Sequence, residues 1–81
     1  SPHPGAIVFV HNVRLKILRT ILPQDAPMQL PTGTFGISSD AKRLFAGTAD
    51  HAIEILELQR EGKRAMTAEE FVRGNREMFT I

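Results

Sequence analysis

Apolar and polar side chains alternate along much of this chain with the two-residue period of β-strands. Residues 6–10 form a continuous apolar run that is rich in β-branched side chains. His11 and Asn12 are typical of a tight turn, and residues 13–17 then alternate between apolar and basic side chains. This alternation predicts a strand with one buried face. The alternation slips near Leu18, where we expect a β-bulge or a sharp bend of the kind that lets sheets curl into barrels.

Further strands are predicted after a proline-rich segment. Residues 23–31 hold three prolines and should form an exposed connection. Short strands follow at residues 33–38, 42–48 and 52–58, with a second change of alternation near residues 55–56. About five short strands with regular turns predict a mainly β fold, a small and partly open antiparallel barrel that carries a short C-terminal α-helix.

The helix is predicted from a set of start and stop signals near the end of the chain. Thr67 is a good N-cap, and Glu70 stands where it completes a capping box. Met66 and Phe71 have the spacing of a hydrophobic staple, and Gly74 suits the left-handed residue that ends a helix. Only about two turns fit between these signals, so the helix must dock on the barrel to be stable.

The barrel and the helix need a shared core, because a chain of this length buries only about 60–65% of its unfolded surface. We predict a core that consists of Ile7, Phe9, Leu15, Ile17, Phe35, Leu44, Phe45, Ile53, Ile55 and Phe71. The chain contains no cysteine, so neither disulfides nor cysteine-bound zinc can supplement this core.

Length and composition predict one domain that covers residues 1–81. The chain starts at Ser1 rather than at methionine, so we expect it to be a domain of a longer protein. Its apolar runs are far shorter than the ~20 residues that span a bilayer, and we predict no association with a membrane.

The sequence offers little catalytic chemistry. The three histidines lack the spacing of a metal site (His3, His11 and His51). Asp50 and His51 are more typical of a hairpin turn than of an acid–base pair, and Ser38 lacks the strand-to-helix elbow of a nucleophile. We therefore predict no catalytic, cofactor-binding or metal-binding residues in this chain.

The basic residues are clustered although the net charge is only +1. They fall within residues 14–19, at residues 42–43 and within residues 60–64, where Gly62 lets a loop turn tightly. If the fold brings the first strand pair and this loop together, a basic stripe results that could hold phosphates. The alternative is an ordinary solvated strand face. The candidate nucleic-acid contacts are Lys63, Arg64, Arg14, Lys16, Lys42 and Arg43. The chain has no Trp or Tyr to stack on bases, so any nucleic acid would be a folded RNA that is held by its backbone.

Several segments resemble one known family. Residues 58–66, Leu-Gln-Arg-Glu-Gly-Lys-Arg-Ala-Met, and the helix that follows them resemble the closing segment of the C-terminal domain of methionyl-tRNA formyltransferases. Residues 2–6, 14–17 and 33–34 resemble other parts of that domain, in the same order. Three departures from the family pattern are His3 in place of Trp, Thr32 in place of Pro, and Asp50-His51 in place of Asp-Gly.

The resemblance implies a function that the residues alone do not. The domain would resemble an oligonucleotide-binding barrel and would position initiator tRNA for a cytoplasmic enzyme. That enzyme would transfer a formyl group from formyltetrahydrofolate to the methionyl group on the tRNA. The folate site and the catalytic residues would lie in an N-terminal domain, which would be the second partner. Alternatively, related formyltransferases that act on sugar nucleotides keep a similar barrel, which would dock on its own catalytic domain without binding RNA.

Overall fold

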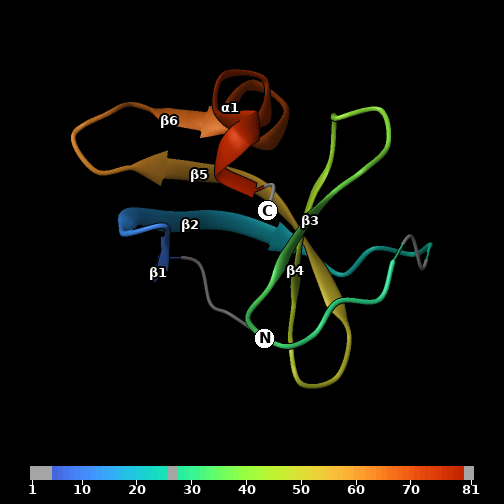
Figure 1. Ribbon diagram of the computed structural model, residues 1–81. Helices are drawn as coiled ribbons and strands as arrows, with labels where there is room; N and C mark the ends of the chain where they lie inside the picture. Colours follow the sequence, from blue (N-terminus) through green and yellow to red (C-terminus); the bar gives the residue numbers. More distant parts are fainter. Residues whose placement is uncertain (1–4, 26–27, 80–81) are drawn as a thin grey trace.

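The computed structural model describes residues 5–25 and 28–79, which form one antiparallel sheet with a helix packed on it (Figure 1). The strands run in the order β1-β2-β5-β4-β3, and β6 pairs with β5 beside this row. The elements are β1 (Ala6–Val10), β2 (Val13–Ile21), β3 (Phe35–Ile37), β4 (Leu44–Gly47), β5 (Ala52–Arg60), β6 (Ala65–Thr67), α1 (Ala68–Asn75) and the 3₁₀-helix η1 (Arg76–Phe79). The predicted fold class, a mainly β, partly open antiparallel barrel with one short C-terminal α-helix, is confirmed, and the sheet forms a half-barrel.

A two-residue turn joins β1 to β2, as the sequence predicts. His11 and Asn12 both have positive φ, 50° and 67°. Such angles belong to the turns whose twist matches that of the flanking strands. Asn tolerates this conformation better than most residues because its short polar side chain can hydrogen-bond locally.

The sheet bends where β2 crosses β5. Leu18 in β2 and Leu56 in β5 lack Cα partners in this pairing, because the register shifts on both sides of Arg19 and Glu57. Both predicted breaks in alternation are thus confirmed. Figure 1 shows β1, β2, β6 and part of β5 on one side of this bend, with β3 and β4 extending away on the other.

The buried core lies between the inner face of the sheet and α1. Seven predicted core residues are at most 2% exposed, namely Leu15, Ile17, Leu44, Phe45, Ile53, Ile55 and Phe71. Five of them form one cluster with Leu58, Ala68 and Val72, of which Leu58 and Ala68 were not predicted. Phe45 is buried on the opposite face of β4, where it pairs with Glu54 and lies under the Arg43 guanidinium. Phe35 is only partly buried and packs against the edge of this core.

Two predicted core residues are wrong, because Ile7 is 40% exposed and Phe9 is 66% exposed. Ile7 pairs across the strands with Lys16, and Phe9 pairs with Arg14. Cross-strand partners share a face of the sheet. The face of β2 that carries the basic side chains is the outer one, so Ile7 and Phe9 lie on the outer face too.

The start of α1 is as predicted, and its end is not. The backbone N–H of Glu70 donates to the Thr67 hydroxyl at 3.2 Å, and the N–H of Thr67 donates to the Glu70 carboxylate at 3.1 Å. Hydrogen bonds from the Thr67 N–H and, to a smaller extent, from the Arg64 guanidinium hold the pKa of the Glu70 carboxyl below its ordinary value. The prediction that Gly74 stops the helix is wrong, because α1 continues to Asn75 and passes into η1.

Substituting Thr67 with alanine removes one half of the capping box. We expect the free energy of unfolding to fall by about 0.5–2 kcal/mol, as for other N-cap substitutions. Thermal or urea unfolding of wild type and Thr67→Ala measures this loss, and Thr67→Ser, which keeps the hydroxyl, is the matched control. Equal stability of the wild type and the alanine variant would contradict the cap.

The connection between β2 and β3 packs closely against the end of β4. The N–H of Thr34 donates to the carbonyl of Pro31 at 3.1 Å, and the N–H of Gly47 donates to the carbonyl of Thr34 at 2.8 Å. A methyl group built on Gly47 would overlap the carbonyl oxygens of Leu30, at 2.7 Å, and of Pro31. Gly47 therefore permits a close approach of two backbone segments, and this contact fixes the connection on the sheet.

Candidate nucleic-acid interface

Arg14 and Lys16 lie on the outer face of β2. They alternate with Leu15 and Ile17, which are 0% and 2% exposed, and are themselves exposed. The strand alternation therefore places both cations toward solvent, as the sequence predicts. Neither forms an ion pair within the described residues.

The turn between β5 and β6 brings a second pair of cations next to Arg14. The N–H of Glu61 donates to the carbonyl of Arg14 at 3.2 Å, so this turn lies against the start of β2. Gly62 has φ of +79°, the conformation that favours glycine. Lys63 and Arg64 follow it and are exposed.

Two hydrogen bonds hold this turn in shape. The N–H of Lys63 donates to the carbonyl of Arg60 at 2.9 Å, and the side-chain amide of Gln59 donates to the carbonyl of Lys63 at 2.9 Å. Arg64 makes an ion pair with Glu70 at 3.4 Å, with both side chains largely in solvent. Exposed pairs of this kind contribute little stability, so Arg64 can exchange Glu70 for another anion at small cost.

Lys42 and Arg43 do not join this group. They lie at the β3–β4 hairpin, and Figure 1 places the turn of that hairpin on the opposite side of the fold from the β1–β2 and β5–β6 turns. Four of the six candidate residues thus share one end of the sheet: Arg14, Lys16, Lys63 and Arg64. We call these four the basic face.

Arg43 has its own carboxylate partners. Its guanidinium donates to both oxygens of Asp25, at 2.8 and 3.1 Å, and to both oxygens of Glu54, at 3.1 and 2.8 Å. Glu54 is 9% exposed, so the pair supplies the counter-charge that a nearly buried carboxylate needs. The guanidinium also lies 4.9 Å from the ring centre of Phe45. Arg43 joins the connection that contains Asp25 to β4 and β5.

This arrangement has a consequence at low pH. The hydrogen bonds from Arg43 hold the pKa of the Asp25 carboxyl below its ordinary value. The ionised Asp25 therefore stabilises the folded state above the ordinary carboxyl pKa. That contribution is lost as the pH falls through the lowered folded value.

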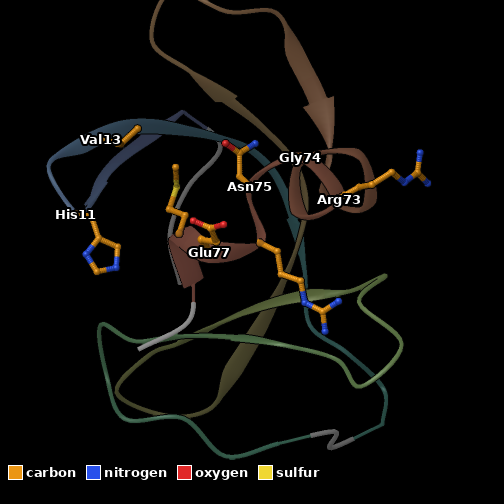
Figure 2. Close-up of a pocket in the computed structure, with 8 residues that line it drawn as sticks. His11, Val13, Arg73, Gly74, Asn75 and Glu77 are labelled. Carbon is orange, nitrogen blue, oxygen red and sulfur yellow. The ribbon is translucent and has the colours of Figure 1, made fainter.

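Two hollows lie beside the C-terminal helical segment and contain residues that were not among the candidate contacts. One hollow, of about 550 Å³, lies between the β1–β2 turn and the α1–η1 segment (Figure 2). Figure 2 shows His11 on one side of it, Asn75 and Glu77 near its middle, and Arg73 extending away. Its lining thus mixes both signs of charge.

The second hollow, of about 280 Å³, shares Asn75 with the first and includes Arg60, Lys63 and Arg64. Arg60 belongs to the basic cluster of residues 60–64 but was not among the candidate contacts. It stands at an inner-face position opposite Leu15, which depends on the pairing of β2 with β5.

The other chemical candidates are structural within the described residues. The Thr48 hydroxyl donates to the carbonyl of His51 at 2.6 Å and accepts from the N–H of His51 at 3.2 Å, which organises the β4–β5 turn. No group of three or more His, Asp or Glu side chains that could hold a metal ion occurs in residues 5–25 and 28–79. His3 lies outside the described residues. The described part of the chain also has no helix long and apolar enough to cross a membrane.

Comparison with known proteins gives one consistent family. The model of the formyl transferase C-terminal domain matches residues 1–76. A methionyl-tRNA formyltransferase of Protochlamydia amoebophila is 40% identical over 79 residues, which cover 91% of this chain and 24% of that protein. The corresponding proteins of Cutibacterium acnes (91% of this chain, 25% of that protein) and Mycolicibacterium gilvum (94% and 24%) are 37% and 32% identical. The chain therefore spans about a quarter of the length of these curated relatives.

Proposed function

Because the chain belongs to the formyl transferase C-terminal domain family, we propose that it is the RNA-positioning domain of a methionyl-tRNA formyltransferase. The single observation that carries the RNA part of this proposal is the basic face. The hydrogen bond between Glu61 and Arg14 joins two hairpins there, and each hairpin carries two of the exposed cations at that end of the sheet.

The chemistry of this face suits a phosphate backbone. Lys and Arg that neutralise phosphates release condensed counterions, which favours binding without reading the base sequence. Three of the four cations, Arg14, Lys16 and Lys63, are not neutralised by a carboxylate of the described residues, so they are available to an RNA.

The domain would contribute to the reaction by proximity. A catalytic domain elsewhere in the same polypeptide would bind formyltetrahydrofolate and carry out the formyl transfer in the cytoplasm. By holding initiator tRNA, this domain would present the methionyl end of the tRNA to that site. The partners are therefore the initiator tRNA and the N-terminal catalytic domain.

A salt series tests the RNA contact. We expect Lys63→Ala, Arg64→Ala and their double variant in the full-length enzyme to bind initiator tRNA more weakly than wild type. The slope of log affinity against log salt concentration should become shallower by somewhat less than about one unit per charge removed. Lys42→Ala is the matched control, because it removes an exposed cation from the opposite side of the fold and should change the slope far less.

The same measurement separates this proposal from the second candidate function. Ile7 and Phe9 are exposed apolar residues, and Phe9 borders an apolar groove of about 400 Å³. These features favour a barrel that docks on its own catalytic domain, as expected for a formyltransferase that acts on sugar nucleotides. Unchanged tRNA affinity and slope in the folded double variant would favour that function instead.

A further inference from the structure

The hollow beside the β5–β6 turn is lined by three cations and, within the described residues, by no carboxylate. Its complete lining is Arg60, Lys63, Arg64, Met66, Phe71 and Asn75. Its volume of about 280 Å³ lies below the range of about 300–1,000 Å³ that is usual for whole small-molecule ligands. The space and the charge therefore suit one small anionic group better than a complete nucleotide.

The side chain of Arg60 is held in place by Asn75 at the end of α1. Its guanidinium donates to the side-chain oxygen of Asn75 at 3.4 Å, and the Asn75 amide donates in turn to the carbonyl of Phe71 at 3.0 Å. Asn75 ends α1, so these contacts fix Arg60 between the sheet and the helix.

Arg60 also lacks a counter-charge. Its side chain is half-buried, its cross-strand partner Leu15 is 0% exposed, and it forms no ion pair within the described residues. Asn75 is the one hydrogen-bond partner of its guanidinium within the described residues, so the other N–H donors are open to an anion that enters the hollow.

We propose that the hollow binds a single phosphate group, and that Arg60 is its principal donor. The planar guanidinium can give two parallel N–H donors to two phosphate oxygens, which an ammonium cannot. Lys63 and Arg64, on the turn above, supply further charge once Arg64 leaves Glu70. The identification of this phosphate as part of an RNA backbone rests on the proposed function. The site would then fix the position of the RNA on the basic face, whereas the exposed cations supply general attraction.

Three variants of full-length protein test this site through initiator-tRNA binding. We expect Arg60→Gln to weaken binding about tenfold, because it removes hydrogen bonds to a charged group. Arg60→Lys should retain only part of the affinity, because it keeps the charge but loses the planar pair of donors. Arg73→Gln removes one positive charge from an exposed pair with Glu69 on the outside of α1, and should weaken binding less than about twofold.

Inorganic phosphate separates the site from the RNA. Titrated into the 81-residue chain and followed by amide NMR, phosphate should shift the signals of residues 60–64 in wild type, and not in Arg60→Gln. Sodium chloride at equal ionic strength should leave these signals in place. If Arg60→Gln melts at a lower temperature than wild type, the phosphate titration is repeated with Arg60→Lys. A reduced shift of residues 60–64 in that variant supports the site, and an unchanged shift contradicts it.

The outcomes of the two experiments are distinct. If Arg60→Gln and Arg60→Lys bind tRNA like Arg73→Gln while the Lys63 and Arg64 variants bind weakly, the phosphate site is wrong and the RNA function stands. If phosphate shifts residues 60–64 but no variant changes tRNA binding, the anion site is supported and the RNA function is wrong.

Discussion

Replacing Phe71 with alanine should lower the free energy of unfolding by about 3–5 kcal/mol, the usual cost of deleting a buried aromatic side chain. Phe71 is 1% exposed and joins the core from α1. Its ring meets Phe79 of η1 edge-on, with ring centres 5.9 Å apart. A domain of this size has only about 5–10 kcal/mol of stability, so the variant should be close to unfolded at physiological temperature. Urea unfolding followed by circular dichroism measures the loss.

The matched control is Phe9→Ala, which removes the same side chain from the outer face. Because Phe9 is 66% exposed, we expect a change of about 0.5 kcal/mol or less. The sequence pattern alone placed both residues in the core and would predict two large losses. A large loss for Phe9→Ala would therefore show that the outer face of β1 is covered in solution.

The second large effect is expected at a glycine. Gly47→Ala should destabilise the domain by about 1–3 kcal/mol or more, because the new methyl group overlaps the carbonyl oxygens of Leu30 and Pro31. Those atoms belong to the backbone, so no side-chain rotation can relieve the overlap. Thermal unfolding should show the loss of stability. If the connection moved away from β4, the ion pair between Arg43 and Asp25 would also be lost.

Gly74→Ala is the opposite case and serves as the control. Gly74 lies inside α1, and no heavy atom lies within 4 Å of the position that a methyl group would occupy. Alanine is the better helix former, so this substitution should raise the stability by about 0.5–1 kcal/mol. If Gly74 were the left-handed stop that the sequence pattern suggests, the same substitution would lower it.

Local signals explain how far the fold could be predicted from the sequence. The capping box at Thr67 and Glu70 and the turn at His11 and Asn12 depend on residues a few positions apart, and both are confirmed. The bend could be predicted because the change from one apolar–polar alternation to the other is visible within each strand by itself.

The errors have a non-local cause. The continuous apolar run of β1 hides which of its faces is covered, and only the pairing with β2 decides this. The end of α1 depends on η1, whose Met78 and Phe79 pack against the core beyond the predicted stop. The three residues of β6 are too few to show a period, and they form a strand because β5 lies beside them.

The candidate site also combines features that the sequence shows locally with features that depend on strand pairing. That Arg14 and Lys16 face solvent follows from alternation along one strand. Their approach to Lys63 depends on the pairing of β2 with β5, which the sequence pattern does not specify. The partners of Arg43 lie 18 and 11 positions away in the chain, so its ion pairs could not be anticipated from its neighbours.

The pairing of β2 with β5 also bears on how the domain folds. The β1–β2 and β5–β6 hairpins each close over a short turn and can form within about 1–10 μs. Joining them requires closure of the loop between β2 and β5. The chain loses conformational entropy in this closure before the new contacts form, so the step is slow. Arg14 belongs to one hairpin and Lys63 to the other, so neither hairpin alone carries the complete basic face. The proposed RNA contact would therefore form only after the two hairpins have joined.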